Sequence, residues 1–180
     1  MIEPRILLDH TQIDLIIRRF ALQIAENHGN LTNCAIIGMQ PRGIMLSRKI
    51  HARLQSLFPE STVRYGELDN TFFRDDIGRG EIHVPRPNRI DFSTEGLNIV
   101  LTDDVLFTGR SVRAGMDALM NFGRPARVEL MTLIDRRYNR ELPISADYVG
   151  AVVDSRSTGE YVRVEWNEDD NKVWLMSKEA

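Results

Sequence analysis

The stretch that decides the fold reads Asn98-Ile-Val-Leu-Thr-Asp-Asp-Val-Leu-Phe-Thr-Gly-Arg-Ser111. Its first residues are apolar and β-branched, which is typical of a buried strand. Two adjacent carboxylates, Asp103 and Asp104, follow at the expected end of that strand, and a Thr-Gly-Arg-Ser turn then opens a helix. The backbone N–H groups of a glycine turn, the helix dipole and the hydroxyls of Thr108 and Ser111 together favour an anion.

The two carboxylates and the turn suit opposite ends of one ligand. Asp103 and Asp104 would repel a phosphate placed beside them, but they accept hydrogen bonds from sugar hydroxyls and can ligate a hard cation such as Mg²⁺. The residues alone therefore indicate a phosphorylated sugar, or a site for phosphate and metal. A bare Asp-Asp pair also follows strands in phosphoryl-acceptor domains and at solvated strand ends, so the pair by itself leaves those alternatives open.

Length and composition fit an ordinary globular protein. With 180 residues, residues 1–180 are expected to form a single domain with a real hydrophobic core. A formal charge of −3 does not force a strongly basic face, and the single cysteine, Cys34, cannot form an internal disulfide. The start of the chain lacks a secretory pattern and no segment is long and apolar enough to span a membrane. We therefore expect a cytoplasmic protein without a membrane partner.

Apolar periodicity predicts an α/β fold. The expected helices cover residues 9–29, 44–57 and 111–122, and the expected buried strands cover residues 34–39, 62–68, 97–101 and 128–134. Strands that alternate with helices pair in parallel through right-handed crossovers, and ligands gather beyond the carboxyl ends of such strands. In the tail, segments 148–153 and 161–166 read as strands with no helix between them, which indicates a small β subdomain or an edge hairpin.

Two further segments attract attention because they flank the predicted ligand edge. The turn Gly38-Met-Gln-Pro-Arg-Gly43 has glycines at both ends and one arginine, a composition that suits an oxyanion as well as an ordinary structural turn. Residues 69–93 lose apolar periodicity and carry several arginines, including Arg74. This second segment is either a solvated surface loop or a lid that excludes water from a reactive intermediate.

Residues 98–111 resemble the phosphoribosyl-pyrophosphate motif of the type I phosphoribosyltransferases, in which apolar residues precede two acids and a Thr-Gly turn follows. The resemblance implies that family's fold, a mostly parallel central sheet flanked by helices, with a small β subdomain called the hood and a flexible loop. It also implies phosphoribosyl pyrophosphate as the donor and Mg²⁺ as the cofactor. The ion would be held by Asp103 and Asp104, or only through the ribose hydroxyls.

The same resemblance implies a role for each part of the site. Asp103 and Asp104 would bind the ribose hydroxyls and stabilise the charge that grows at the anomeric carbon, while Arg74 and its loop would screen water. The residues expected to contact the donor are Pro41, Arg42 and Gly43 at the pyrophosphate, and Val105, Leu106, Phe107, Thr108, Gly109, Arg110 and Ser111 along the motif, with the 5-phosphate in the Thr108–Ser111 turn.

The identity of the base depends on the position before Thr108-Gly109. Hypoxanthine-type members carry an acid there, which exchanges a proton with the purine, whereas this chain has Phe107. An aromatic ring can stack on a base but cannot act as its acid, which favours a pyrimidine, unless Phe107 merely packs. By resemblance, the base would lie between Phe107, the pair Asp135 and Arg136, and the pair Tyr148 and Val149.

Further stretches match in order, from about residue 5 to residue 165. They are Ile37-Gly-Met-Gln-Pro-Arg-Gly-Ile44, Phe73-Arg-Asp-Asp76, Asn121-Phe-Gly-Arg-Pro-Ala-Arg-Val128 and Arg140-Glu-Leu-Pro-Ile-Ser-Ala-Asp-Tyr-Val-Gly150. Together they are similar to the branch of the family that joins uracil phosphoribosyltransferase activity to attenuation of pyrimidine operons. This implies conversion of uracil and phosphoribosyl pyrophosphate to UMP and pyrophosphate, a leader RNA as a second partner, and a homo-oligomer. The alternatives are a UMP-sensing, RNA-binding regulator with little catalytic role, and a transferase for another base.

RNA binding would require a basic surface that displaces counterions. The candidates are Arg18, Arg19, Arg137 and Arg140, with Arg48, Lys49, Arg53 and Arg136 nearby in the sequence. Charged helix faces are also commonly just solvated. The chain departs from the branch at residues 137–139, which replace a Gly-His pair, at Ser145, which replaces an arginine, and at residues 151–152, which replace Lys-Asn. Each departure removes a polar or cationic group and argues against RNA binding.

Overall fold

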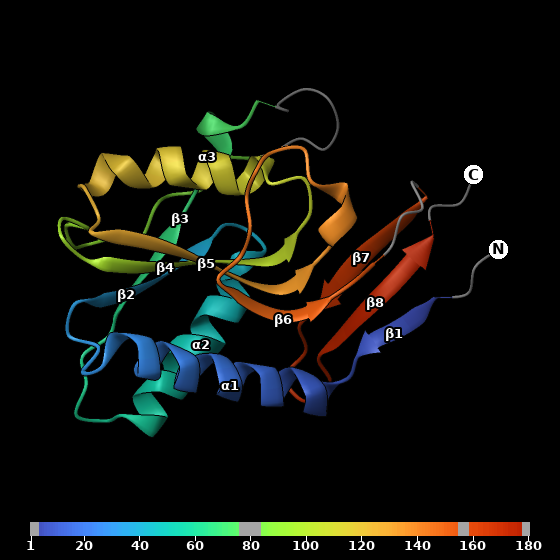
Figure 1. Ribbon diagram of the computed structural model, residues 1–180, viewed down its shortest axis with the longest axis horizontal. Helices are drawn as coiled ribbons and strands as arrows, with labels where there is room; N and C mark the ends of the chain where they lie inside the picture. Colours follow the sequence, from blue (N-terminus) through green and yellow to red (C-terminus); the bar gives the residue numbers. More distant parts are fainter. Residues whose placement is uncertain (1–3, 76–83, 155–158, 178–180) are drawn as a thin grey trace.

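The computed structural model describes residues 4–75, 84–154 and 159–177 (Figure 1). Its main element is a five-stranded parallel sheet in the order β3-β2-β4-β5-β6. The strands are β2 (Cys34–Met39), β3 (Arg64–Leu68), β4 (Asn98–Leu106), β5 (Arg127–Asp135) and β6 (Tyr148–Val152). The α/β class and the parallel sheet predicted from the alternating pattern are confirmed.

Helices cover both faces of this sheet. α1 (His10–His28) and α2 (Gly43–Leu57) lie on one face, and α3 (Arg110–Leu119) lies on the other (Figure 1). Successive residues of β4 serve the two layers: Val100 packs in the core with α1 and α2, whereas Ile99 and Leu101 pack in the core with α3. This alternation explains why the strand reads as a continuous apolar run.

The helix boundaries follow local chemistry. At the start of α1, the Asp9 side chain accepts from Gln12 N–H at 2.9 Å and the Gln12 side chain accepts from Asp9 N–H at 3.0 Å, so the predicted capping box is present. Gly29 closes that helix with a positive φ of 60°. Short 3-10 helices occupy Thr71–Phe73, Met120–Phe122 and Arg137–Asn139. No helix of the described residues is long and apolar enough to cross a membrane.

The small β subdomain differs from the prediction. Segment 148–152 does not belong to it, because β6 pairs in parallel with β5 and completes the main sheet. The subdomain is an antiparallel sheet in the order β1-β8-β7, formed by β1 (Arg5–Leu8), β7 (Glu160–Glu165) and β8 (Lys172–Ser177). β1 and β8 were not predicted, because short strands give only a weak alternating signal.

β4 is also longer than predicted. The strand was expected to end at residue 101, with the two acids beyond it, but it continues to Leu106. It pairs with β2 only as far as Thr102, whereas it pairs with β5 to its last residue. Asp103 and Asp104 therefore lie within a strand tail that is hydrogen-bonded to β5 alone, and this open side faces the end of β2 and the turn that follows.

Residues 69–93, the segment predicted as a loop or hairpin, are anchored to β3 by hydrogen bonds. Glu67 of β3 and Arg89 form an isolated antiparallel bridge, with N–H to carbonyl distances of 3.1 and 2.8 Å. The Glu67 carboxylate also accepts from Arg48 at 2.6 and 2.9 Å. Residues 76–83, the centre of the proposed lid, lie outside the described residues.

Candidate functional site

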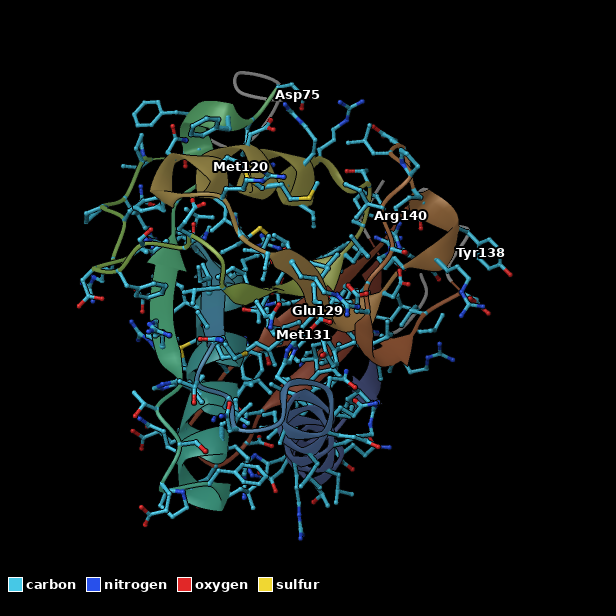
Figure 2. The ribbon with its side chains drawn as sticks, turned by 60° about the vertical axis from the view of Figure 1, so that its left-hand side comes forward. Asp75, Met120, Glu129, Met131, Tyr138 and Arg140 are labelled. Carbon is cyan, nitrogen blue, oxygen red and sulfur yellow. The ribbon has the colours of Figure 1, made fainter. Side chains whose placement is uncertain are left out.

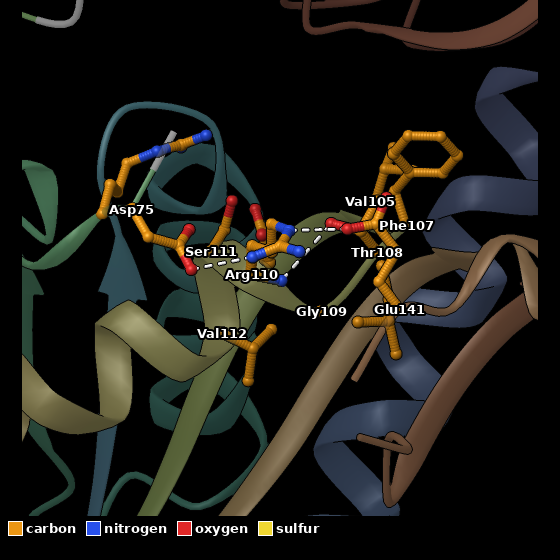
Figure 3. A pocket seen from close by; sticks show the side chains of 12 residues that line it. Asp75, Val105, Phe107, Thr108, Gly109, Arg110, Ser111, Val112 and Glu141 are labelled. Carbon is orange, nitrogen blue, oxygen red and sulfur yellow. Dashed lines mark hydrogen bonds and ion pairs between the residues drawn. The ribbon is translucent and has the colours of Figure 1, made fainter. Parts of the chain in front are cut away.

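A pocket of about 470 Å³ opens where β4 ends and α3 begins (Figure 3). It is lined by Arg74, Asp75, Asp103, Val105, Leu106, Phe107, Thr108, Gly109, Arg110, Ser111, Val112 and Glu141. The structure thus brings together Arg74 and most of the predicted motif. Sequence reasoning did not identify Asp75, Val112 and Glu141 as part of this wall.

The turn from Thr108 to Ser111 has the geometry of an anion cup. Gly109 adopts a φ of +93°, a backbone conformation that residues with a side chain rarely adopt. A Cβ at this position would also lie 3.3 Å from Ile144 Cδ1. Thr108 is fixed from behind, because its carbonyl accepts from the N–H groups of Glu141 and Leu142 at 3.0 and 3.2 Å. The first turn of α3 points its backbone N–H groups and its dipole at this corner.

The paired acids carry an unusual electrostatic load. Asp104 is buried, Asp103 is partly buried and lines the pocket, and Asp104 N–H donates to Asp103 Oδ1 at 2.9 Å. Burial raises the pKa of Asp103 well above its ordinary value, and the charge of Asp104 raises it further. Burial also raises the pKa of Asp104, an effect that the positive charge of Arg42 partly offsets. The pair is therefore poised for a hydrogen-bond donor or a cation.

The second turn is pressed against the same strand tail. A Cβ on Gly43 would lie 2.2 Å from the carbonyl oxygen of Thr102 and 3.1 Å from Asp103 Cα, so only glycine fits there. This contact places the start of α2 beside the acids, and it explains why the Arg42 charge acts on both of them. Pro41, Arg42 and Gly43 do not line the pocket itself; they lie next to its acidic corner.

Ion pairs span the pocket mouth. Arg110 donates to Glu141 at 2.6 Å and to Asp75 at 2.8 Å, so one guanidinium joins two chain segments across the opening (Figure 3). Glu141 belongs to the Arg140-Glu-Leu-Pro stretch that carried the family resemblance, which was the available signal. Arg110 already has carboxylate partners, so the cup relies on backbone N–H groups and hydroxyls.

Phe107 joins the pocket to a neighbouring cluster, called here the aromatic wall, which consists of Phe107, Asp135, Arg136 and Arg140. The ring of Phe107, 43% exposed, lies 4.5 Å from the guanidinium carbon of Arg136. Arg136 is buried. Its backbone N–H donates to the Leu106 carbonyl at 2.9 Å. The Nε atom of its side chain has no hydrogen-bond partner in the described residues. Arg140 donates to the Phe107 carbonyl and to the Asp135 carboxylate. Phe107, Arg136 and Asp135 are therefore neighbours, but Asp135 and Arg136 do not line the pocket, so their contact with a base stays a prediction.

Tyr148 does not join this wall. Its side chain is 3% exposed and packs in the core with α1, where its hydroxyl donates to Glu129 at 2.8 Å and accepts from Asn27 at 2.9 Å. His28 Nε2 lies 2.7 Å from the same Glu129 carboxylate. Glu129 lies apart from Arg140, a member of the aromatic wall (Figure 2). The Tyr148 side chain is thus part of a buried polar cluster, contrary to its expected contact with a base, and does not line the pocket.

The four arginines considered for RNA binding, Arg18, Arg19, Arg137 and Arg140, differ in their contacts. Arg19 donates to the carbonyls of Val149 and Gly150 at 3.0 Å each and so ties α1 to β6. Arg140 lies within the aromatic wall, as described above. Arg18, Arg19 and Arg137 are exposed, and Arg140 is partly buried. Two of the four residues, Arg19 and Arg140, are thus engaged in hydrogen bonds to backbone carbonyls.

Nothing in the described residues resembles a complete metal cage: no group of three or more His, Cys, Asp or Glu side chains could hold an ion. The acid pair alone fits a different arrangement. Mg²⁺ commonly keeps several waters and binds one or two carboxylates together with substrate phosphates. Asp103 and Asp104 suit that partial role.

The burial of the Asp103 carboxylate, together with its repulsion by Asp104, predicts the effect of Asp103→Asn on stability. In the folded protein the pKa of Asp103 lies above its ordinary value of 3.8, so the folded state holds the proton more tightly than the unfolded state. The free energy of unfolding therefore falls as the pH rises above 3.8. At pH 7 the variant should melt at a higher temperature, by about 2–4 °C per kcal/mol of burial penalty and repulsion removed. Thermal unfolding at pH 7 and below pH 3.8 measures this gain, which should vanish at the lower pH. A lower melting temperature at pH 7, with exposed Asp91→Asn unchanged, would contradict it.

Comparisons with known proteins agree with this site. The family model described as phosphoribosyl transferase domain matches residues 5–169. The chain is 43% identical to "Bifunctional protein PyrR" of Roseiflexus sp. (strain RS-1), over 93% of this chain and 90% of the relative. It is 40% identical to the protein of the same name in Endomicrobium trichonymphae, over 92% and 93% of the two chains.

Solved structures confirm the fold. A hypoxanthine phosphoribosyltransferase from Staphylococcus aureus superposes with a TM-score of 0.66 at 19% identity, covering 85% of this chain and 80% of that one. A hypoxanthine phosphoribosyl transferase from Trypanosoma cruzi gives 0.68 at 21% identity, covering 84% and 78%. The predicted type I phosphoribosyltransferase fold is thus confirmed. The chain belongs to the phosphoribosyltransferase family and, within it, to the PyrR proteins.

Proposed function

We propose that this chain transfers ribose 5-phosphate from phosphoribosyl pyrophosphate to uracil, giving UMP and pyrophosphate. The observation that carries the proposal is the juxtaposition of Asp103 and an amide-lined turn in one pocket at the end of β4, with Asp104 buried directly beside Asp103. A phosphorylated pentose presents hydroxyls to the acids and a phosphate to the turn, so it satisfies both. The PyrR relatives support the wider assignment, because their shared name describes a bifunctional protein.

The phosphate end of the donor belongs in the Thr108–Ser111 turn. Backbone N–H groups at the start of α3 and the hydroxyls of Thr108 and Ser111 provide donors for its oxygens. The turn of Pro41, Arg42 and Gly43 would face the pyrophosphate on the other side of the acids. Arg42 then offers a guanidinium to the leaving group, since its charge already reaches both carboxylates.

The acids act on the sugar. Asp103 and Asp104 would accept hydrogen bonds from the 2- and 3-hydroxyls, which relieves their mutual repulsion when the substrate binds. As the bond to pyrophosphate stretches, positive charge grows at the anomeric carbon, and the two nearby carboxylates stabilise it. Asp103 and Asp104 would hold Mg²⁺ directly or through the ribose hydroxyls, and the bound ion would supply positive charge that neutralises the pyrophosphate. Arg74, on the wall of the pocket, would help to screen water from the cation.

The aromatic wall would receive the base. Phe107 offers a ring face for stacking, and the Arg136 guanidinium packs against that ring. Asp135, held by Arg140, accepts hydrogen bonds at the same wall. Val149 does not line the pocket, and its contact with the base is carried over from the resemblance alone. No group of this wall needs to act as a covalent nucleophile.

Asp104→Asn tests the assigned electrostatic role. Removing one carboxylate from the developing cation should lower kcat by about a hundredfold or more, in the range of other electrostatic transition-state groups. Pyrophosphate release under saturating substrates measures the effect, with circular dichroism to verify folding. A folded variant with the kcat of the parent protein would show that Asp104 plays no such role.

A panel of bases tests the substrate. Incubation with phosphoribosyl pyrophosphate, Mg²⁺ and either uracil, cytosine, hypoxanthine or guanine should release pyrophosphate with uracil, because Phe107 stands where a purine-specific enzyme would place an acid. We expect kcat/KM for uracil to exceed that for each purine by roughly tenfold or more, given the cost of leaving buried polar groups unpaired. Turnover with a purine alone would reject uracil and leave the family assignment intact.

A second function is regulatory: UMP-dependent binding of leader RNA. The observation in its favour is the name of the relatives, which describes two functions. Filter binding of a pyrimidine-operon leader with and without UMP should show tighter binding with UMP. The double variant Arg18→Ala and Arg137→Ala should weaken binding and reduce its salt dependence while turnover is retained. Absence of UMP-dependent binding by the parent protein would exclude this role.

A further inference from the structure

A buried polar hub lies where β3 ends, outside the pocket. Its centre is Asp69, Asn70 and Thr71, all buried. The Asp69 carboxylate accepts from Thr71 N–H at 3.0 Å and from the Thr71 hydroxyl at 3.2 Å. It also accepts from Arg86 N–H at 3.2 Å. Buried polar groups cost stability unless they are fully bonded, so a cluster of this kind fixes the positions of the segments it joins.

Asn70 reaches from this hub to both predicted phosphate turns. Its Nδ2 donates to the carbonyl of Ser111, in the first turn of α3, at 2.8 Å. The same Nδ2 lies 3.9 Å from the sulfur of Met39, the last residue of β2. Asn70 is 3% exposed and does not line the pocket, so its amide is available for holding structure.

Met39 extends the connection. It directly precedes the turn that ends at Gly43, and its sulfur packs so closely on α3 that a Cβ on Gly115 would lie 2.4 Å away. Residues next to the hub hold that turn itself: Gln40 N–H donates to the carbonyl of Leu68, the last residue of β3, at 2.8 Å, and the Gln40 side chain donates to the Pro87 carbonyl at 2.9 Å. Both turns are therefore connected to the end of β3 by these contacts.

We propose that Asn70 is a positioning residue that sets the spacing between the two phosphate turns. The inference rests on the proposed function, in which one donor molecule spans both turns. A ligand that must engage two sites at once is sensitive to their separation, whereas a ligand of one site is not. A misplacement of about 1 Å can cost on the order of a hundredfold in such geometry.

The test is Asn70→Leu, which keeps the approximate shape of the side chain and removes the donor without adding charge. Calorimetry compares three probes: phosphoribosyl pyrophosphate with Mg²⁺, which spans both turns, UMP, whose single phosphate engages only the Thr108–Ser111 turn, and inorganic pyrophosphate with Mg²⁺, which engages only the turn that ends at Gly43. The donor should bind about tenfold more weakly or worse. UMP and pyrophosphate should each change by less than about threefold, because each engages a single turn.

Asn121→Leu is the matched control. Asn121 lies at the other end of α3 and is exposed, and its amide donates to the carbonyls of Ala118 and Asp117 at 3.0 and 3.3 Å. The substitution therefore removes the same kind of side-chain bond to a helix carbonyl, far from either turn. All three probes should bind this variant as they bind the parent protein.

The outcomes separate the two claims. Equal losses for all three probes with Asn70→Leu would show a merely structural role, and unchanged donor binding would also overturn the inference. If the leucine variant does not fold, Asn70→Ser provides the same comparison in a smaller side chain, with the same expected selectivity for the donor. If the parent protein itself fails to bind the donor, the proposed function fails, and the selectivity claim fails with it.

Discussion

Two adjacent carboxylates on a partly dehydrated strand tail are the constraint on which the site depends. Asp103 and Asp104 lie in the second half of β4, where pairing with β2 has ended and pairing with β5 continues. Burial and mutual repulsion raise the pKa of Asp103, so this corner is electrostatically unfavourable when empty. Such a corner lowers the stability of the empty protein, and hydroxyl donors or a bound cation would remove that cost.

The surrounding architecture brings two anion-binding turns to that corner. Gly43 fits against the Thr102 carbonyl only because it lacks a side chain, which seats the first turn of α2 beside β4. The positive φ of Gly109 lets the chain reverse directly from β4 into α3. Two turns from different crossovers thus meet at one strand, with the acids between them. Parallel topology concentrates such ends at one edge of the sheet, and the central position of β4 makes the arrangement stiff.

Much of this was readable from the sequence. The order strand, two acids, glycine turn and helix in residues 98–111 predicted the pocket wall, since each signal is local. The capping box at Asp9 and the apolar run at 34–39 predicted their elements for the same reason. The continuation of β4 past residue 101 was not predicted, because acids in a strand are unusual and only pairing with β5 stabilises them.

The remaining errors involve contacts between distant segments. Tyr148 was expected at the base, but the hydrogen bonds of Glu129 and Asn27 draw its side chain into the core beneath α1. Glu141 and Asp75 enter the pocket mouth through Arg110, from segments that no sequence pattern connects. Segment 148–152 pairs with β5 although nothing in its own sequence distinguishes it from a strand of the small sheet.

The central claim is that one phosphorylated pentose spans the acid pair and the Thr108–Ser111 turn. A crystal structure with phosphoribosyl pyrophosphate and Mg²⁺ tests this most directly. The account predicts the 5-phosphate within hydrogen-bond distance of the backbone N–H groups of Gly109 to Ser111, and the ribose hydroxyls on Asp103 and Asp104. A donor bound elsewhere, or one whose pyrophosphate occupies the Thr108–Ser111 turn, would contradict it.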